Sequence, residues 1–184
     1  ADATNVVVTD NVPEGVTFFE NTRISHFTIV NGESAITLSV DGEDTVAQPL
    51  FENIVIHGVA SCAVDCSTQA GKCAPVLSKV KIRPDANGEY GVYSATSGIC
   101  CNASQDGLCA MTLSEVIVEG VSETAVVVEG PSDFSMSHCQ FQNAMPAEDE
   151  EATPWGTGLS FTTPDNGEGN VDRKSTRLNS SHYS

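Results

Sequence analysis

Short apolar runs recur in pairs along this 184-residue chain, and this recurrence constrains its fold more than any other feature. The first run of a pair ends in an apolar residue before a turn, and the second opens with a small residue and continues apolar, as in Val118–Val128. Alternation with a period of two, interrupted by Gly, Pro, Asn and Asp, is typical of β-strands. Six such pairs are spaced 20 to 34 residues apart, and their second runs open at Gly15, Ala35, Ala63, Gly91, Ala125 and Gly158.

A repeat of this length predicts stacked structural units. Two short strands with one apolar face each cannot form a core alone, but units stacked at about 4.8 Å bury a continuous apolar column. We therefore expect an all-β fold, a parallel β-helix of about six coils. An antiparallel β-sandwich, which also has many short strands, is the alternative.

Four segments carry a resemblance to the right-handed parallel β-helix, or pectin-lyase-like, superfamily: Phe51–Ile56, Leu77–Ile82, Leu113–Val118 and His138–Ala144. The resemblance extends over about residues 3–165. It implies a right-handed solenoid and leaves the activity open, because one fold hosts many functions.

The last part of the chain differs from everything before it. Residues 172–182 contain three of the eight basic residues and show no apolar alternation, and they resemble the in-frame translation of a sequencing adapter. A natural basic tail is the alternative. We expect residues 1–171 to be a β-helix segment and residues 172–184 to be non-native. Because the chain also lacks an initiator Met, we expect it to be an internal piece of a larger protein, whose remainder is then a partner.

The charge balance excludes some classes of partner. The formal net charge of −17 repels polyphosphates and anionic lipid surfaces. No apolar run reaches the roughly 18 residues that a membrane-spanning helix needs. We expect neither nucleic-acid binding nor membrane insertion.

Six of the seven cysteines fall into two similar segments. Residues 66–74 align with residues 101–110, and Cys62 and Cys100 add one thiol to each group. Equivalent loops of successive coils lie close together, so we expect disulfides and an extracellular or cell-surface location. Fifteen connectivities are available to six cysteines. Among them we favour Cys66–Cys73, Cys101–Cys109 and Cys62–Cys100. A zinc site is the alternative, although the spacing and the lack of a nearby His fit it poorly.

The seventh cysteine and one asparagine carry separate predictions. Cys139 aligns with the inward residues Ile54, Val80 and Val116, so we expect a buried small hydrophobe there. Asn102 begins the sequence Asn-Ala-Ser and is a candidate for N-glycosylation in one of the cysteine loops.

The one basic feature before the tail is the run Lys79, Lys81 and Arg83, which alternates with inward apolar residues. One interpretation is contact with an anionic sugar such as a uronate. The other, which we favour, is cross-strand ion pairing of Lys79 with Glu115 and of Arg83 with Glu119 in the next coil. Trp155 either stacks on a sugar ring or covers the acidic insertion around it.

Acidic loops and arginines decide what chemistry we expect. Two acidic segments are weak candidates for calcium binding: Asp41, Glu43 and Asp44, and the run 148–151. Neither segment has an ordered ligand spacing. We expect no other cofactor. Pectate-lyase-like catalysis needs an Arg base beside calcium, and polygalacturonase-like catalysis needs clustered aspartates. Only Arg23 and Arg83 precede the tail, and no second Arg follows Arg83 as the lyase pattern needs. His57-Gly58 lacks the preceding Gly and the companion Asp pair of the hydrolases, so no catalytic residue is assigned.

These observations together predict a non-catalytic segment of a secreted or cell-surface β-helix protein with a structural, adhesive or glycan-binding role. Its expected ligand is a polysaccharide or another surface glycan. The alternative is a fragment of a carbohydrate-active polysaccharide lyase or glycoside hydrolase whose site lies outside this piece.

Overall fold

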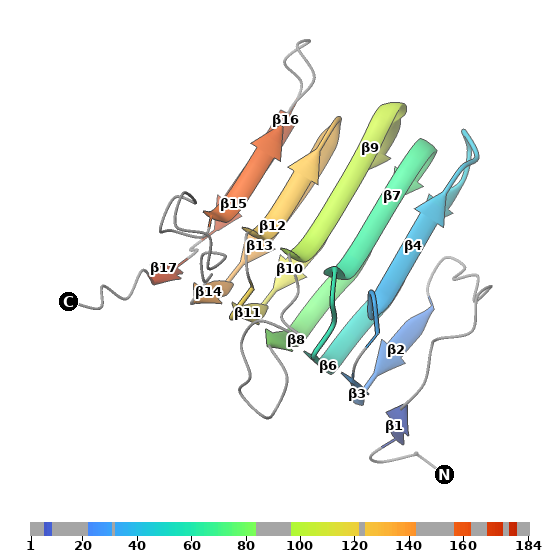
Figure 1. Ribbon diagram of the computed structural model, residues 1–184. Coiled ribbons are helices and arrows are strands. Elements are labelled where there is room, and N and C mark those ends of the chain that lie inside the picture. The colour runs from blue at the N-terminus through green and yellow to red at the C-terminus, as the bar shows by residue number, and fades with distance from the viewer. Residues whose placement is uncertain are drawn as a thin grey trace.

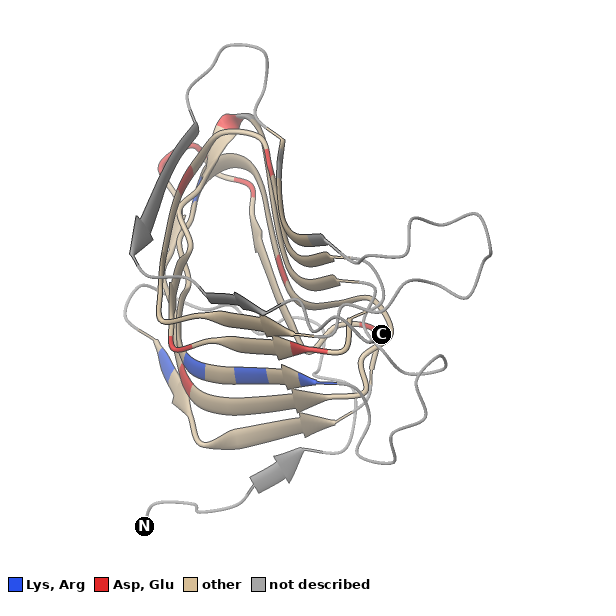
Figure 2. Cartoon of the chain, turned by 90° about the vertical axis from the view of Figure 1, so that its left-hand side faces the viewer, with Lys and Arg blue, Asp and Glu red and all other residues tan. Residues whose placement is uncertain are grey.

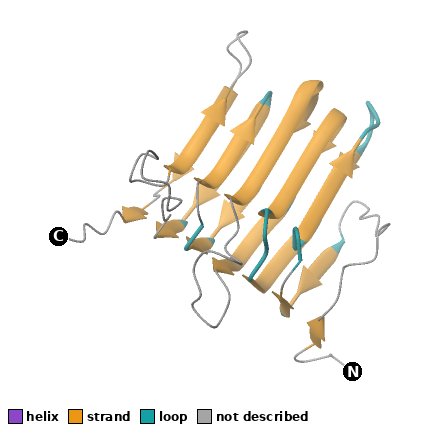
Figure 3. Ribbon diagram, viewed as in Figure 1, coloured by secondary structure: helices purple, strands orange, loops and turns teal. Residues whose placement is uncertain are grey.

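A computed structural model describes residues 6–8, 22–30, 32–83, 97–121, 124–142, 157–162, 169–174 and 177–179. In these ranges all regular structure is β-strand, and the strands lie side by side along one axis (Figures 1 and 3). Every strand pairing in the described part is parallel, which excludes the antiparallel sandwich and confirms the parallel β-helix. Among the described residues, no helix is long and apolar enough to cross a membrane.

Each coil passes through three stacks of parallel strands. The first stack is formed by β4 (Ile36–Val40), the first part of β7 (Cys62–Cys73), the first part of β9 (Ser97–Cys109), β12 (Thr124–Glu129) and β15 (Thr157–Thr162). Long β7 and β9 continue around the bend into the next stack, where β5 (Val46–Ala47) pairs with the end of β7. The strand pairing between neighbouring coils therefore continues while the chain turns from the first stack into the second.

The second and third stacks follow one another in each coil. The second contains β2 (Arg23–Ser25), the beginnings of β6 (Leu50–His57) and β8 (Val76–Arg83), β10 (Thr112–Ser114), β13 (Ser132–Ser137) and β16 (Gly169–Lys174). The third contains β1 (Val6–Val8), β3 (Phe27–Val30), the ends of β6 and β8, β11 (Ile117–Glu119), β14 (Gln140–Gln142) and β17 (Arg177–Asn179).

The core is a set of apolar columns inside the coil, one residue per coil in each column. Leu77 lies between Phe51 and Leu113 in register, and all three are at most 1% exposed. In the first stack, alternate residues point inward, as the alternating burial of Ile36–Val40 shows. The buried columns are rich in β-branched and aliphatic residues, with aromatic residues such as Phe51 and Phe134 among them, and these side chains pack well on a pleated surface. This continuous core is the feature that the repeat predicted.

The register confirms most of the repeat alignment and corrects one unit. Ala63, Ala125 and Gly158 fall at equivalent positions, but the coil between the first two of these is opened by Gly98 rather than Gly91. A Cβ atom at Gly98 would lie 2.5 Å from a methyl carbon of Val118. Small residues are therefore needed here because the core is narrow. Gly15 and Gly91 lie outside the described residues.

The segment expected to be non-native also contributes strands. Residues 172–174 extend β16 alongside β13, and residues 177–179 form β17 alongside β14. The non-native origin of residues 172–184 stays a prediction, because strand pairing carries no information about the source of a sequence.

Candidate functional site

The basic strand β8 lies on the outer surface of the second and third stacks. Val80 and Ile82 are at most 1% exposed and point into the core. Lys79 is exposed, and Lys81 and Arg83 are partly exposed. The run of three basic residues therefore faces outward, as predicted, and Figure 2 shows it as a basic run along one strand of the lower face.

The chain bends sharply between the second and third stacks, and Lys79 sits at this bend. Its φ is 55°, a left-handed backbone conformation that non-glycine residues rarely adopt. The same conformation occurs once per coil in a column of aligned residues with φ between 53° and 64°: His26, Asn53, Lys79, Glu115 and His138. Ladder hydrogen bonds hold the bend, for example from the Glu115 N–H to the Ser137 carbonyl at 3.0 Å.

This column of left-handed residues is absent from the sequence-based predictions, although the sequence carries a signal for it. Inward residues are normally two apart, but at the bend they are three apart, as from Phe51 to Ile54 and from Leu77 to Val80. The same three-residue step recurs in each described coil. Two consecutive residues outside the core require a change of direction, and in β8 this change falls at Lys79.

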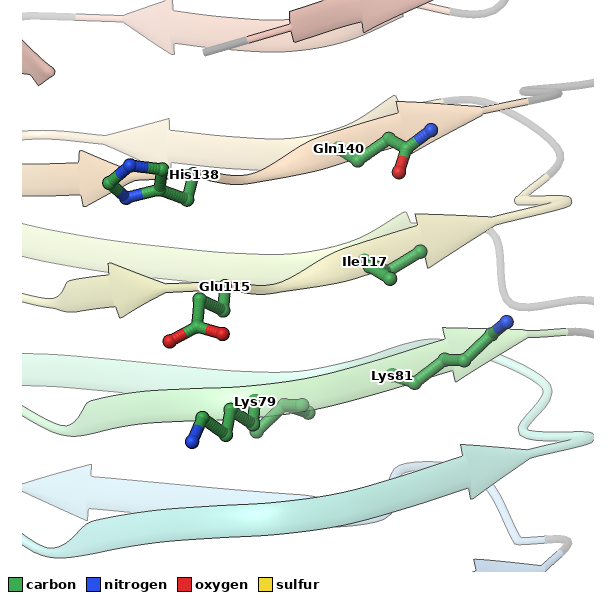
Figure 4. A pocket seen from close by; sticks show the side chains of 7 residues that line it. Lys79, Lys81, Glu115, Ile117, His138 and Gln140 are labelled. Atoms are coloured by element: carbon green, nitrogen blue, oxygen red, sulfur yellow. The ribbon is translucent and has the colours of Figure 1, made fainter. Parts of the chain in front are cut away.

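An open groove of about 590 Å³ lies over this bend and crosses three successive coils. Figure 4 shows its side chains: they come from β8, from the β10–β11 coil and from the β13–β14 coil. The outer coils of the three are about 10 Å apart at the ordinary strand spacing. The groove offers charged, amide and apolar groups together, from Lys79, Lys81, Glu115, Ile117, His138 and Gln140.

The predicted ion pairs of the basic strand are wrong in their partners. The register is as expected, since Lys81 lies opposite Ile117 and Ile82 opposite Val118. However, the ion pair that forms is Lys81 with Glu119, at 3.2 Å between Nζ and Oε1. A long, flexible lysine reaches a diagonal neighbour on the same face as easily as the residue directly opposite.

Neither predicted pair forms: Lys79 and Glu115 are not at ion-pair distance, and neither are Arg83 and Glu119. The described part of the chain has one other ion pair between side chains, Arg23 with Glu52 in the second stack. Lys79 therefore presents an ammonium group to the groove, whereas the charge of Lys81 is partly neutralised.

Charge is unevenly distributed around the coil. Figure 2 shows acidic residues gathered where the chain turns from the first stack to the second, at the top of the view. The exposed residues Asp41, Glu43 and Asp44 lie after β4 at this turn, and Asp106 and Glu129 belong to strands that reach it. The groove, in contrast, combines the lysines Lys79 and Lys81 with the carboxylate of Glu115.

The cysteines pair as favoured by the sequence. Cys66 pairs with Cys73, Cys101 with Cys109 and Cys62 with Cys100, with Cα–Cα separations of 6.5, 6.1 and 6.2 Å. These separations are in the ordinary range for disulfides. The cysteines are therefore in disulfides and not around a zinc ion, and three disulfides are consistent with a secreted protein.

Two details of the cysteine analysis are decided by the structure. The cysteine segments are strands and not loops, because the ladder between β7 and β9 continues around the bend with one irregularity after Thr68. Asn102 consequently lies in β9, partly exposed, and not in a loop. Cys139 is free and 2% exposed, which confirms that it is a buried small hydrophobe.

The remaining predicted site residues do not join the groove. Asp41, Glu43 and Asp44 are exposed at their turn, and the described residues contain no group of three or more His, Cys, Asp or Glu side chains able to hold a metal ion. Trp155 and the acidic run 148–151 lie outside the described residues.

Comparison with known proteins adds no relative: no family model, no curated protein and no solved structure matches this chain.

Proposed function

We propose that this chain is a non-catalytic segment of a secreted or cell-surface β-helix protein, of the pectin-lyase-like kind that its sequence resembles. In this proposal it binds an extended surface polysaccharide in the groove over Lys79 and His138. The observation that carries the proposal is that groove, in which polar side chains are repeated at the coil spacing.

Three features support a carbohydrate ligand. The groove is open and crosses three coils, so a polymer can enter it from the side. Its amide, carboxylate and ammonium groups match the hydroxyl and charged substituents of sugars. Ile117 adds an apolar surface for the faces of sugar rings.

A rigid frame also supports the proposal. Lys79, Lys81, Ile117 and Gln140 belong to strands, while Glu115 and His138 lie at the bends between paired strands. The residues that follow Lys79 and Glu115, Val80 and Val116, are fully buried. Sites built on strands hold their geometry better than sites built on loops. A polymer bound there loses little energy to rearrangement of the protein.

The proposal is tested by binding of the full chain to a panel of soluble polysaccharides: polygalacturonate, alginate, a sulfated galactan and a neutral glucan. We expect at least one to bind, with an affinity that falls as salt rises, since Lys79 and Lys81 contribute charge. Failure of every member of the panel to bind would overturn the proposal.

The site is tested with Lys79→Asn. Asparagine tolerates the left-handed backbone and already occupies the equivalent position at Asn53, so the variant removes the charge while retaining the bend. We expect binding weaker by roughly fivefold, the effect of losing about 1 kcal/mol. The matched control is Lys72→Gln, which removes a lysine charge near the end of β7, outside the groove. Equal effects of the two substitutions would place the ligand elsewhere.

A further inference from the structure

The three disulfides differ in exposure and in what they connect. Cys66–Cys73 and Cys101–Cys109 each close a short span of 7 or 8 residues, and all four residues are 0% exposed. Cys62–Cys100 joins β7 to β9 across successive coils, with a sequence separation of 38. Its residue Cys100 is partly exposed, while Cys62 is 6% exposed.

Strand alternation explains this exposure. Ile99 and Cys101 point into the core and are 0% exposed, so Cys100 between them faces outward on the first stack. Its neighbours in register are Asp65 in one adjacent coil and Val127 in the other. A nucleophile from solvent thus has a route to the Cys100 sulfur that the four inward cysteines lack.

We propose that Cys62–Cys100 is a thiol–disulfide exchange site, which an external dithiol opens while the two buried disulfides stay intact. One thiolate of the dithiol attacks Sγ of Cys100, the disulfide bond breaks, and Cys62 leaves as a thiolate that takes a proton. The second thiolate then attacks the dithiol's own sulfur in the mixed disulfide. The dithiol closes into a cyclic disulfide, and Cys100 leaves as a thiolate and is protonated. Two electrons pass from the dithiol to the protein.

The surroundings of Cys62 suit the reduced state. Its Sγ lies 3.2 Å from the carbonyl oxygen of Val64, so the released thiol has a hydrogen-bond acceptor. The ladder on either side of the bridge, with Cys62 opposite Ser97 and Val64 opposite Ile99, does not depend on the disulfide. Opening the bridge therefore removes a covalent tie between two coils and leaves the strands paired.

Asp65 provides an internal check on this mechanism. Its position beside Cys100 places a carboxylate near the incoming thiolate, and two like charges repel each other. We expect Asp65→Asn to open the bridge faster than the wild-type chain. The matched control, Asp133→Asn, removes an exposed acidic residue from β13 and leaves the rate unchanged.

The experiment is timed reduction of the oxidised, folded chain by dithiothreitol at pH 7.5, with iodoacetamide quenching and identification of the labelled cysteines by mass spectrometry. We expect Cys62 and Cys100 to be labelled roughly tenfold faster than the other four disulfide cysteines, because exchange follows access. A Cys139→Ala variant run in parallel excludes scrambling through the free thiol. The proposal is overturned if all six cysteines are labelled together, if a buried pair reacts first, or if no bridge opens without denaturant.

Discussion

Lys81 of β8 is paired with Glu119 of β11 along a diagonal of the ladder, although the residue directly opposite Lys81 is Ile117. The pairing shows how side-chain length, and not register alone, selects partners on the outer face of a parallel sheet. It also takes up Glu119, the carboxylate opposite Arg83 when the register of Val118 with Ile82 is extended by one residue.

This ion pair is expected to contribute little to stability. The Lys81 and Glu119 side chains are 34% and 28% exposed, so water screens the attraction between them. A double-mutant cycle with Lys81→Met and Glu119→Gln, followed by urea unfolding, is expected to give a coupling of about 0.2–1 kcal/mol. A coupling well above 2 kcal/mol would mean that the pair is more isolated from solvent than its exposure indicates.

Gly71 is expected to be irreplaceable at the bend between the first and second stacks. Its φ is +89°, and a Cβ atom there would collide with the backbone oxygens of Gly42 and Thr45. We expect Gly71→Ala to lower the free energy of unfolding by more than about 2 kcal/mol.

The matched control is Gly32→Ala, where φ is +120° but the nearest atom to a new Cβ is the Ser34 oxygen at 3.6 Å. Gly32→Ala measures the destabilisation caused by placing a side chain on a backbone with positive φ, without a steric collision. Equal destabilisation of the two variants, measured by urea unfolding, would contradict the close approach at Gly71.

The apolar column is tested at Leu113, which is 0% exposed between Leu77 and Met136 in register. Leu113→Ala leaves a cavity in a column that cannot collapse from either side, so we expect a loss of about 2–5 kcal/mol. Ile117→Ala, on the outward side of the same coil, is the control and is expected to cost much less. Calorimetric unfolding measures both, and similar losses would argue against a core inside the coil.

Asp65 is expected to make stability depend on pH. Burial raises the pKa of its carboxyl above the ordinary value of 3.8, so the protonated form is more favoured in the folded chain than in the unfolded chain. The protonated carboxyl of Asp65 contributes to the stability of the folded chain. This contribution to stability is fully present below pH 3.8 and is lost as the pH rises through the raised pKa of the folded state. Asp65→Asn is therefore expected to be more stable than the wild type at pH 7 and to show no gain at pH 3.

Urea unfolding of the wild type and of Asp65→Asn at pH 7 and pH 3 measures this effect. The repulsion among the other acidic residues is common to the two chains, so it cancels when their free energies of unfolding are subtracted at each pH. Asp133→Asn, at an exposed position, is the control. A loss of stability on Asp65→Asn at pH 7 would show that the carboxylate has a favourable partner.

Much of the core could be predicted from local patterns. The Leu-Ser pairs predict that Leu77 aligns with Leu113, and the cysteine spacing predicts that Cys66 aligns with Cys101. Both pairs lie opposite each other in the ladder, so both predictions are confirmed. Such patterns are reliable because a side chain in a strand points inward or outward according to its place in the alternation. The fourth repeat unit was misplaced because small-then-apolar sequences occur at both Gly91 and Gly98, and the pattern cannot choose between them.

The repeat and the strand alternation predict an all-β chain with an apolar interior and six cysteines close to one another. Both patterns are local properties of the chain, and they leave the antiparallel sandwich as an alternative. The parallel pairing between coils excludes that alternative, and the contacts between coils also select which outward groups meet. Glu119 reaches Lys81, and Lys79 and His138 share a groove, because the left-handed bend turns every coil at the same place. That bend is held by hydrogen bonds between coils, so its consequences exist only in the stacked molecule.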